Sequence, residues 1–146
     1  MSLNLNTRFI TLDEFKEYTG IDLEVEIKKD GNPSRTAEAF LERTIDRLET
    51  YLAVEYFKNM GPIYEHFNNF NKACYKKALI EQVLYVFRNG EIGVDSGVDL
   101  EEGCKVSRNY IKTLMIAPFA EQKLIQCGVL NRNVNAIRGG FYGYGY

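Results

Sequence analysis

The sequence has 146 residues, of which 45% are hydrophobic and 26% are charged, and its formal net charge is −2. This length suits a single domain with a substantial core, and the composition excludes wholesale disorder. No apolar run approaches the roughly 18 residues of a membrane span, and residues 1–6 lack the features of a secretory signal. We therefore expect a single domain that is made and kept in the cytoplasm.

The charges are unevenly distributed along the chain. Residues 1–102 contain 12 Lys and Arg against 19 Asp and Glu, whereas residues 103–146 contain six Lys and Arg against one Glu. Such a distribution predicts an acidic body and a basic last third. Complementary contacts and simple solvation both remain open as its explanation.

The first helix signal is Thr11-Leu12-Asp13-Glu14, which has the pattern of a capping box. Gly20 is a natural stop for the helix that follows. The apolar residues of Ile21 to Ile27 alternate with acidic ones, which is typical of a strand. No partner strand is evident, so we predict an extended connection that ends at the turn of residues 30–33.

The longest predicted helix spans about residues 35–57, with Ser34 as its cap and an apolar stripe at three- and four-residue spacing. Its charged residues are interpreted as a solvated surface. Met60-Gly61-Pro62 is expected to end this helix. A third helix begins near Asn69 or Asn71 and runs to Asn89, and its second half is apolar nearly all round, which predicts the central helix of the fold.

The remaining chain predicts two short helices after a loop rich in Gly and Asp at residues 91–103. Ser107 is the predicted cap of a helix through Ile116, and Pro118 opens a final helix that ends at Cys127-Gly128. The sequence thus predicts an all-α bundle of four or five helices at residues 1–130. A flexible tail rich in Gly and Tyr follows at residues 131–146.

Few residues have the chemistry or spacing of an active site. His66 is the sole histidine, and Cys74 would lie about 12 Å from it along a helix, which is too far for a nucleophile and its base. Cys74, Cys104 and Cys127 lack the short spacing of structural zinc ligands. No common nucleotide-binding, hydrolase or metalloprotease motif is present. We expect no catalytic residue, no metal and no cofactor.

Two segments superficially resemble binding motifs. The acidic loop from Asp95 has Gly97, Leu100 and Val106 where a calcium-binding loop needs an oxygen ligand, Gly and Glu, so a flexible acidic loop is preferred. Residues 107–128 resemble a helix-turn-helix, but the second helix offers only Glu121 and Lys123 as charged residues. One charge of each sign makes a poor phosphate-binding face.

The tail combines aromatic residues with glycines, a composition that suits no core. Exposed Tyr and Phe are typical anchors of protein interfaces, whereas disorder is common at chain ends, and both interpretations remain open. The candidate partner-binding residues are Arg138, Phe141, Tyr142, Tyr144 and Tyr146.

The capped helix at residues 11–15, the long amphipathic helix at 37–52, the apolar helix at 76–85 and the short last helix follow in an order that resembles a known family. These are the small helical head–tail adaptor (connector) proteins of tailed bacteriophages and prophages. The resemblance covers roughly Thr11 to Leu130. It implies a ring of identical subunits beneath the portal of the filled capsid. This ring would extend the DNA channel and offer a docking surface for the next protein of the neck.

The resemblance also implies the partners. These are the chain itself, the portal protein, the next neck or head-completion protein and passing DNA read without sequence specificity, with no membrane contact. Residues 131–146 would engage the portal, and the protein would move from the host cytoplasm to the virion neck. The charge distribution suggests subunit contacts, with candidate residues Lys112, Lys123, Asp95, Asp99 and Glu101. The alternatives are a DNA-binding or DNA-packaging accessory protein of the small terminase type and an enzyme with an unrecognised site.

Overall fold

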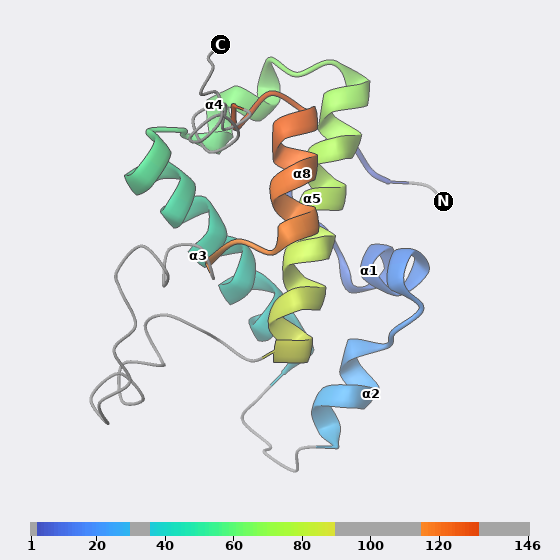
Figure 1. The fold of residues 1–146 in the computed structure, drawn as a ribbon. Helices are drawn as coiled ribbons and strands as arrows, with labels where there is room; N and C mark the ends of the chain where they lie inside the picture. Colours follow the sequence, from blue (N-terminus) through green and yellow to red (C-terminus); the bar gives the residue numbers. More distant parts are fainter. Residues whose placement is uncertain (1–2, 30–35, 90–114, 132–146) are drawn as a thin grey trace, which may run out of the picture.

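A computed structural model describes residues 3–29, 36–89 and 115–131 of the chain. Helices account for 72% of these described residues, with no strand among them, which confirms the predicted all-α class (Figure 1). The described helices are α1 (Leu12–Thr19), α2 (Leu23–Lys28), α3 (Ala37–Tyr56), α4 (Met60–Glu65), α5 (Asn69–Asn89) and α8 (Pro118–Gln126).

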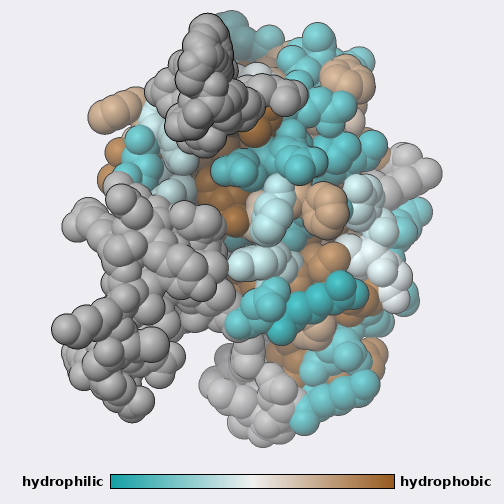
Figure 2. Space-filling model, viewed as in Figure 1, coloured by the Kyte–Doolittle hydropathy of each residue, from teal (hydrophilic) through white to brown (hydrophobic). Residues whose placement is uncertain are grey.

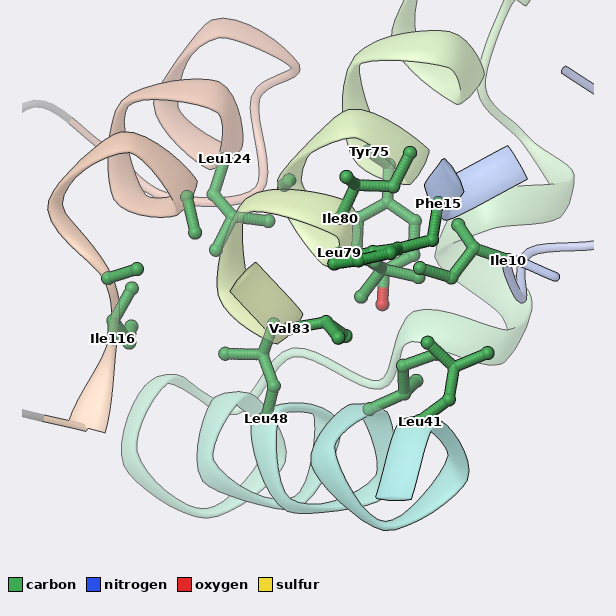
Figure 3. Close-up of a cluster of buried hydrophobic side chains, with 14 of the residues drawn as sticks. Ile10, Phe15, Leu41, Leu48, Tyr75, Leu79, Ile80, Val83, Ile116 and Leu124 are labelled. Atoms are coloured by element: carbon green, nitrogen blue, oxygen red, sulfur yellow. The ribbon is translucent and has the colours of Figure 1, made fainter. Parts of the chain in front are cut away.

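Helix α5 is the centre of the bundle, as its apolar sequence predicted. It packs against α8, α3 and α1, and the close-up in Figure 3 shows side chains from all three reaching it. Its buried stripe is Ala78, Leu79, Ile80 and Val83. Leu124 of α8, Leu48 of α3 and Phe15 of α1 pack around this stripe, and each is almost completely buried. Burial of such side chains contributes about 1.5–3 kcal/mol each.

Helix α1 has the predicted boundaries and the predicted cap. The Thr11 hydroxyl accepts from the N–H of Glu14 at 3.1 Å, and the Glu14 carboxylate accepts from the N–H of Thr11 at 2.9 Å. Gly20 ends the helix in the left-handed region with φ 78°, a conformation that glycine adopts at no steric cost.

The predicted extended connection from Ile21 to Ile27 is wrong, because this segment forms α2. The Asp22 carboxylate accepts from the N–H groups of Glu24 and Val25, and so caps the helix. Leu23 and Ile27 are four residues apart and both are buried, whereas Val25 is 51% exposed. The alternating pattern therefore concealed a helical i, i+4 pair. The predicted turn at 30–33 lies outside the described residues.

Helix α3 begins two residues later than the predicted cap Ser34 suggested. The cap is Thr36, whose hydroxyl accepts from the N–H of Ala39 at 3.1 Å, and Ser34 itself lies outside the described residues. The helix ends at Tyr56, where Phe57 adopts a left-handed conformation with φ 56°. This conformation is strained for a residue with a bulky side chain.

Met60-Gly61-Pro62 does not end a helix but opens α4, which the sequence did not predict. Pro62 occupies the first turn, where its missing N–H costs no intrahelical bond. The predicted start of α5 is confirmed, with the Asn68 side chain accepting from the N–H of Asn71 at 2.8 Å. Pro118 opens α8 as predicted, and Gly128 follows it with φ 86°.

Candidate functional site

A buried ion pair joins the N-terminal segment to the centre of the bundle. The Lys76 ammonium of α5 lies 3.0 Å from the Glu14 carboxylate, with side-chain exposures of 0% and 8%. Lys76 also donates to the carbonyl of Asn4, and Glu14 accepts from the N–H groups of Asn4 and Thr11. A buried charge pair is tolerated when hydrogen bonds satisfy both partners, and here they do.

Burial by itself raises the pKa of the Glu14 carboxyl, but hydrogen bonds from Asn4, Lys76 and Thr11 outweigh that effect and lower the pKa below its ordinary value. Glu14 is therefore ionised at neutral pH and saturated with donors. A group in this state suits a structural role better than general acid–base catalysis, which needs a pKa near the working pH.

Two further polar contacts hold the N-terminal segment, defined here as residues 3–10. The Tyr64 hydroxyl of α4 donates to the carbonyls of Leu5 and Thr7, at 2.9 and 3.1 Å. Glu49 of α3 accepts from the Arg8 guanidinium at 3.0 Å and from the buried Tyr75 hydroxyl at 2.5 Å. Side chains from four helices thus position this segment.

A buried glutamine similarly fixes the chain before α8. The Gln82 side chain of α5 donates to the carbonyl of Met115 at 3.0 Å and accepts from the N–H of Ala117 at 2.8 Å. Both polar atoms of the amide are used. The pair of bonds fixes the chain at Ala117, the N-cap residue directly before α8 begins at Pro118.

An open groove of about 980 Å³ lies between the N-terminal segment, α1, α2 and one face of α3. Its apolar lining comes from Phe9, Ile10, Leu12, Ala39, Leu41 and Ile45. Its charged lining comes from Arg8, Arg43, Asp13, Glu24, Glu38, Glu42, Asp46 and Glu49. The described lining therefore has six carboxylates and two guanidinium groups, a net charge of −4.

Five of the six carboxylates, all except Glu49, are on exposed residues. No ion pair joins any of these five to another described residue. Glu49 is neutralised by Arg8 at one end of the groove, so the negative potential is concentrated along Glu38, Glu42 and Asp46 of α3. A groove with an apolar floor and an acidic rim suits a basic polypeptide and repels nucleic acid.

Hydrophobic side chains reach the surface on the other side of α3. Figure 2 shows them between α3 and α8, in the view of Figure 1. Tyr51 lies on this side, because it is two residues beyond Glu49, about 200° around the helix. Burial raises the pKa of Tyr51, with contributions from Tyr56, Glu55 and Glu121 of α8.

Large aromatic side chains are also exposed at helix ends. Phe57 is 89% exposed just beyond α3, and Phe119 is 68% exposed in the first turn of α8. Phe57 combines this exposure with a strained backbone conformation. Exposed aromatic residues of this kind are typical of protein interfaces.

Most of the site residues expected from the sequence lie outside the described residues. These are Lys112, Asp95, Asp99, Glu101, Arg138, Phe141, Tyr142, Tyr144 and Tyr146. Lys123 is described: it lies half-buried on α8, and its ammonium is 3.3 Å from the Gln126 side-chain oxygen. The first half of the helix-turn-helix pattern, most of the helix expected from Ser107, and Cys104 also fall outside.

The described residues of the metal and nucleophile hypotheses are His66, Cys74 and Cys127. His66 is exposed, with its Nδ1 2.9 Å from the carbonyl of Pro62. Cys74 and Cys127 are buried, and burial raises the pKa of the Cys127 thiol to about 11. In the part of the chain that the structure describes, no group of three His, Cys, Asp or Glu is placed to hold a metal ion. None of the described helices is long and apolar enough to cross a membrane.

Three features of the structure were not predicted from the sequence: the buried Lys76, the row of groove carboxylates on α3, and the bonds of Gln82. The spacing of residues in the sequence carried a signal for the first two. Lys76 precedes Leu79, Ile80 and Val83 by three, four and seven residues, so it belongs to the buried stripe of α5. The groove carboxylates of α3 are spaced by four, four and three residues, which places them on one face of that helix. The pairing of Gln82 with Met115 and Ala117 had no local signal.

The comparisons with known proteins do not assign the chain to a family. No family model matches it, and neither the curated proteins nor the solved structures contain a significant match.

Proposed function

We propose that the chain is a structural head–tail connector protein, which forms a ring of identical copies beneath the portal of a tailed bacteriophage or prophage. The helices α1, α3, α5 and α8 follow in the order on which the resemblance rests, and they form one all-α bundle. The proposed role is non-catalytic, with the portal and the next neck protein as partners.

The observation that carries the proposal is the pair of unlike surfaces on the two sides of α3. One side has the acidic groove, and the other has hydrophobic side chains between α3 and α8. A closed ring uses heterologous contacts, in which one surface of each copy meets a different surface of the next. Unlike surfaces fit that requirement better than a two-fold dimer, which needs one self-complementary surface.

The roles of the residues outside the described part belong to the same proposal. Phe141, Tyr142, Tyr144 and Tyr146 would anchor the chain to the portal. Lys112 and Lys123 would face Asp95, Asp99 and Glu101 of the next copy, so reversing the charge of both lysines should weaken ring formation.

Co-expression with the portal protein of the same genome, followed by electron microscopy, tests the proposal. We expect rings of the full chain on the portal, and no rings from a chain truncated after Leu130. The truncated chain should keep its helical circular dichroism signal, because none of the described core side chains is removed. A full chain that neither binds the portal nor is needed for infectious particles contradicts the proposal. Salt-dependent duplex binding well below micromolar would favour the DNA-packaging alternative.

A further inference from the structure

The acidic groove beside α3 has the chemistry of a peptide-binding site. Its floor is lined by buried apolar residues such as Ile10, Leu41 and Ile45, and its rim carries exposed carboxylates. A suitable ligand is an extended segment with apolar side chains between basic ones and without acidic residues. Such a segment would bury its apolar side chains on the floor and place its cations at the rim.

We propose that this groove binds residues 132–138 of a second copy of the same chain. This segment reads Arg132-Asn133-Val134-Asn135-Ala136-Ile137-Arg138. It has a cation at each end, no carboxylate, and three apolar residues (Val134, Ala136 and Ile137) with two asparagines between the cations. Its charge of +2 is opposite to the net charge of −4 of the described groove lining.

The groove could be occupied by residues 132–138 of the same copy or of a second copy. The place where the described chain ends favours the second copy. Val129 and Leu130 are buried, and their N–H groups donate to the carbonyl of Leu124, so the chain leaves the body at the end of α8. The groove lies on the face of α3 turned away from the side that Tyr51 shares with α8. Residues 132–138 span at most about 25 Å, and to enter their own groove they would have to reach the opposite face of α3. We therefore assign the segment to the groove of a neighbouring copy.

The inference deepens the proposed self-assembly and rests on it, although it does not depend on a phage role. Arg138, which the resemblance assigned to the portal, here contacts the neighbouring copy. The aromatic residues from Phe141 to Tyr146 stay available for the portal. Each copy then gives its segment to one neighbour and receives one from another, which is the heterologous contact of a ring.

Charge exchange between two full-length variants tests the inference. The groove variant carries Glu42→Lys and Asp46→Lys, and the segment variant carries Arg132→Glu and Arg138→Glu. Sedimentation at low salt over a range of protein concentrations measures self-association. We expect each variant alone to associate at least about tenfold more weakly than the wild type, because two attractive charge contacts become repulsive.

An equimolar mixture of the two variants should associate again, because each basic groove then meets an acidic segment and each acidic groove a basic one. The matched control reverses two exposed carboxylates that lie outside both the groove and the α3–α8 side, Glu17→Lys and Glu65→Lys, and should associate like the wild type. Circular dichroism checks that every variant keeps its helices.

Two results would overturn the inference. A wild-type chain that stays monomeric excludes a second copy as the occupant; protection of the groove from hydrogen exchange in that monomer would assign it to the chain's own segment. A mixture that associates no better than its components, beside a wild type that does associate, means that another surface joins the copies. In that second case the connector proposal survives and only the groove assignment fails.

Discussion

The two ends of the described chain pack against α5 by different kinds of contact. The N-terminal segment contributes Ile10 to the core, and four polar side chains fix the rest of it, with Lys76 and Glu14 at the centre and Tyr64 and Glu49 beside them. Helix α8 packs against α5 mainly through apolar residues, among them Ala120 and Leu124, and its start is fixed by Gln82.

The apolar contacts of α8 mainly contribute stability, whereas the polar contacts of the N-terminal segment mainly fix its position. Apolar packing tolerates small shifts and contributes free energy in proportion to the area buried. A buried ion pair contributes little net free energy after its desolvation, but it becomes costly when one partner is removed. The N-terminal segment forms one wall of the groove, so its position requires contacts that accept a single geometry. Substitutions in the two regions should therefore differ in size and in pH dependence.

The largest effect should come from Lys76→Met, which leaves the Glu14 carboxylate buried without its cation. We expect the free energy of unfolding to fall by about 3–5 kcal/mol in urea denaturation at neutral pH. Lys77→Met, at the neighbouring half-buried position, is the control and should change it little. A loss as small as that of the control would mean that water solvates Glu14 once Lys76 is gone.

Adding Glu14→Gln to Lys76→Met should recover much of that loss, because glutamine still accepts from the N–H of Thr11 and carries no charge. The double-mutant cycle then measures the coupling between the two charges. If the two losses simply add, the ion pair is not the reason for either of them.

Next in size, Leu124→Ala should lower the free energy of unfolding by about 3 kcal/mol, because it opens a cavity between α8 and α5. Ile125→Ala, one residue along and only partly buried, should cost less. This loss should be the same at pH 7 and at acidic pH, in contrast to the effects at Glu14. A pH-dependent loss would link α8 to the polar contacts.

A smaller effect is expected for Gln82→Leu, which leaves the N–H of Ala117 buried without an acceptor. Such a group costs about 1–3 kcal/mol. Gln122→Leu, on the exposed face of α8, should have almost no effect on urea denaturation. Equal losses for the two variants would show that Gln82 contributes only by filling space.

The smallest effect should be a difference in acid sensitivity. The lowered pKa of Glu14 means that its ionised form stabilises the folded state. This contribution is complete above the unfolded-state pKa of about 4.3 and is lost as the pH falls through the lower folded-state value. Urea denaturation at pH values from neutral to acidic should therefore show a weaker decline for Glu14→Gln with Lys76→Met than for the wild type. Parallel declines would assign the acid sensitivity to other carboxylates.

The sequence by itself determined the features that depend on near neighbours. Thr11 and Glu14 lie three residues apart and predicted the cap of α1, and Pro118 predicted the start of α8. The apolar residues of α5 predicted its central place, because a helix that is apolar nearly all round has to be buried. Interactions within one or two turns are encoded by spacing alone.

Only the tertiary structure decided the rest, because its contacts join residues far apart in the chain. Lys76 meets Glu14 across 62 positions, Tyr75 meets Glu49 across 26, and Ala117 meets Gln82 across 35. The groove likewise needs the N-terminal segment to lie against the carboxylate face of α3, a packing that spacing within α3 does not specify. Even α2 became a helix against its alternating pattern. Leu23 and Ile27 are buried in the core while Val25 between them is exposed. A strand would place all three on one face, whereas a helix turns Val25 away from the other two.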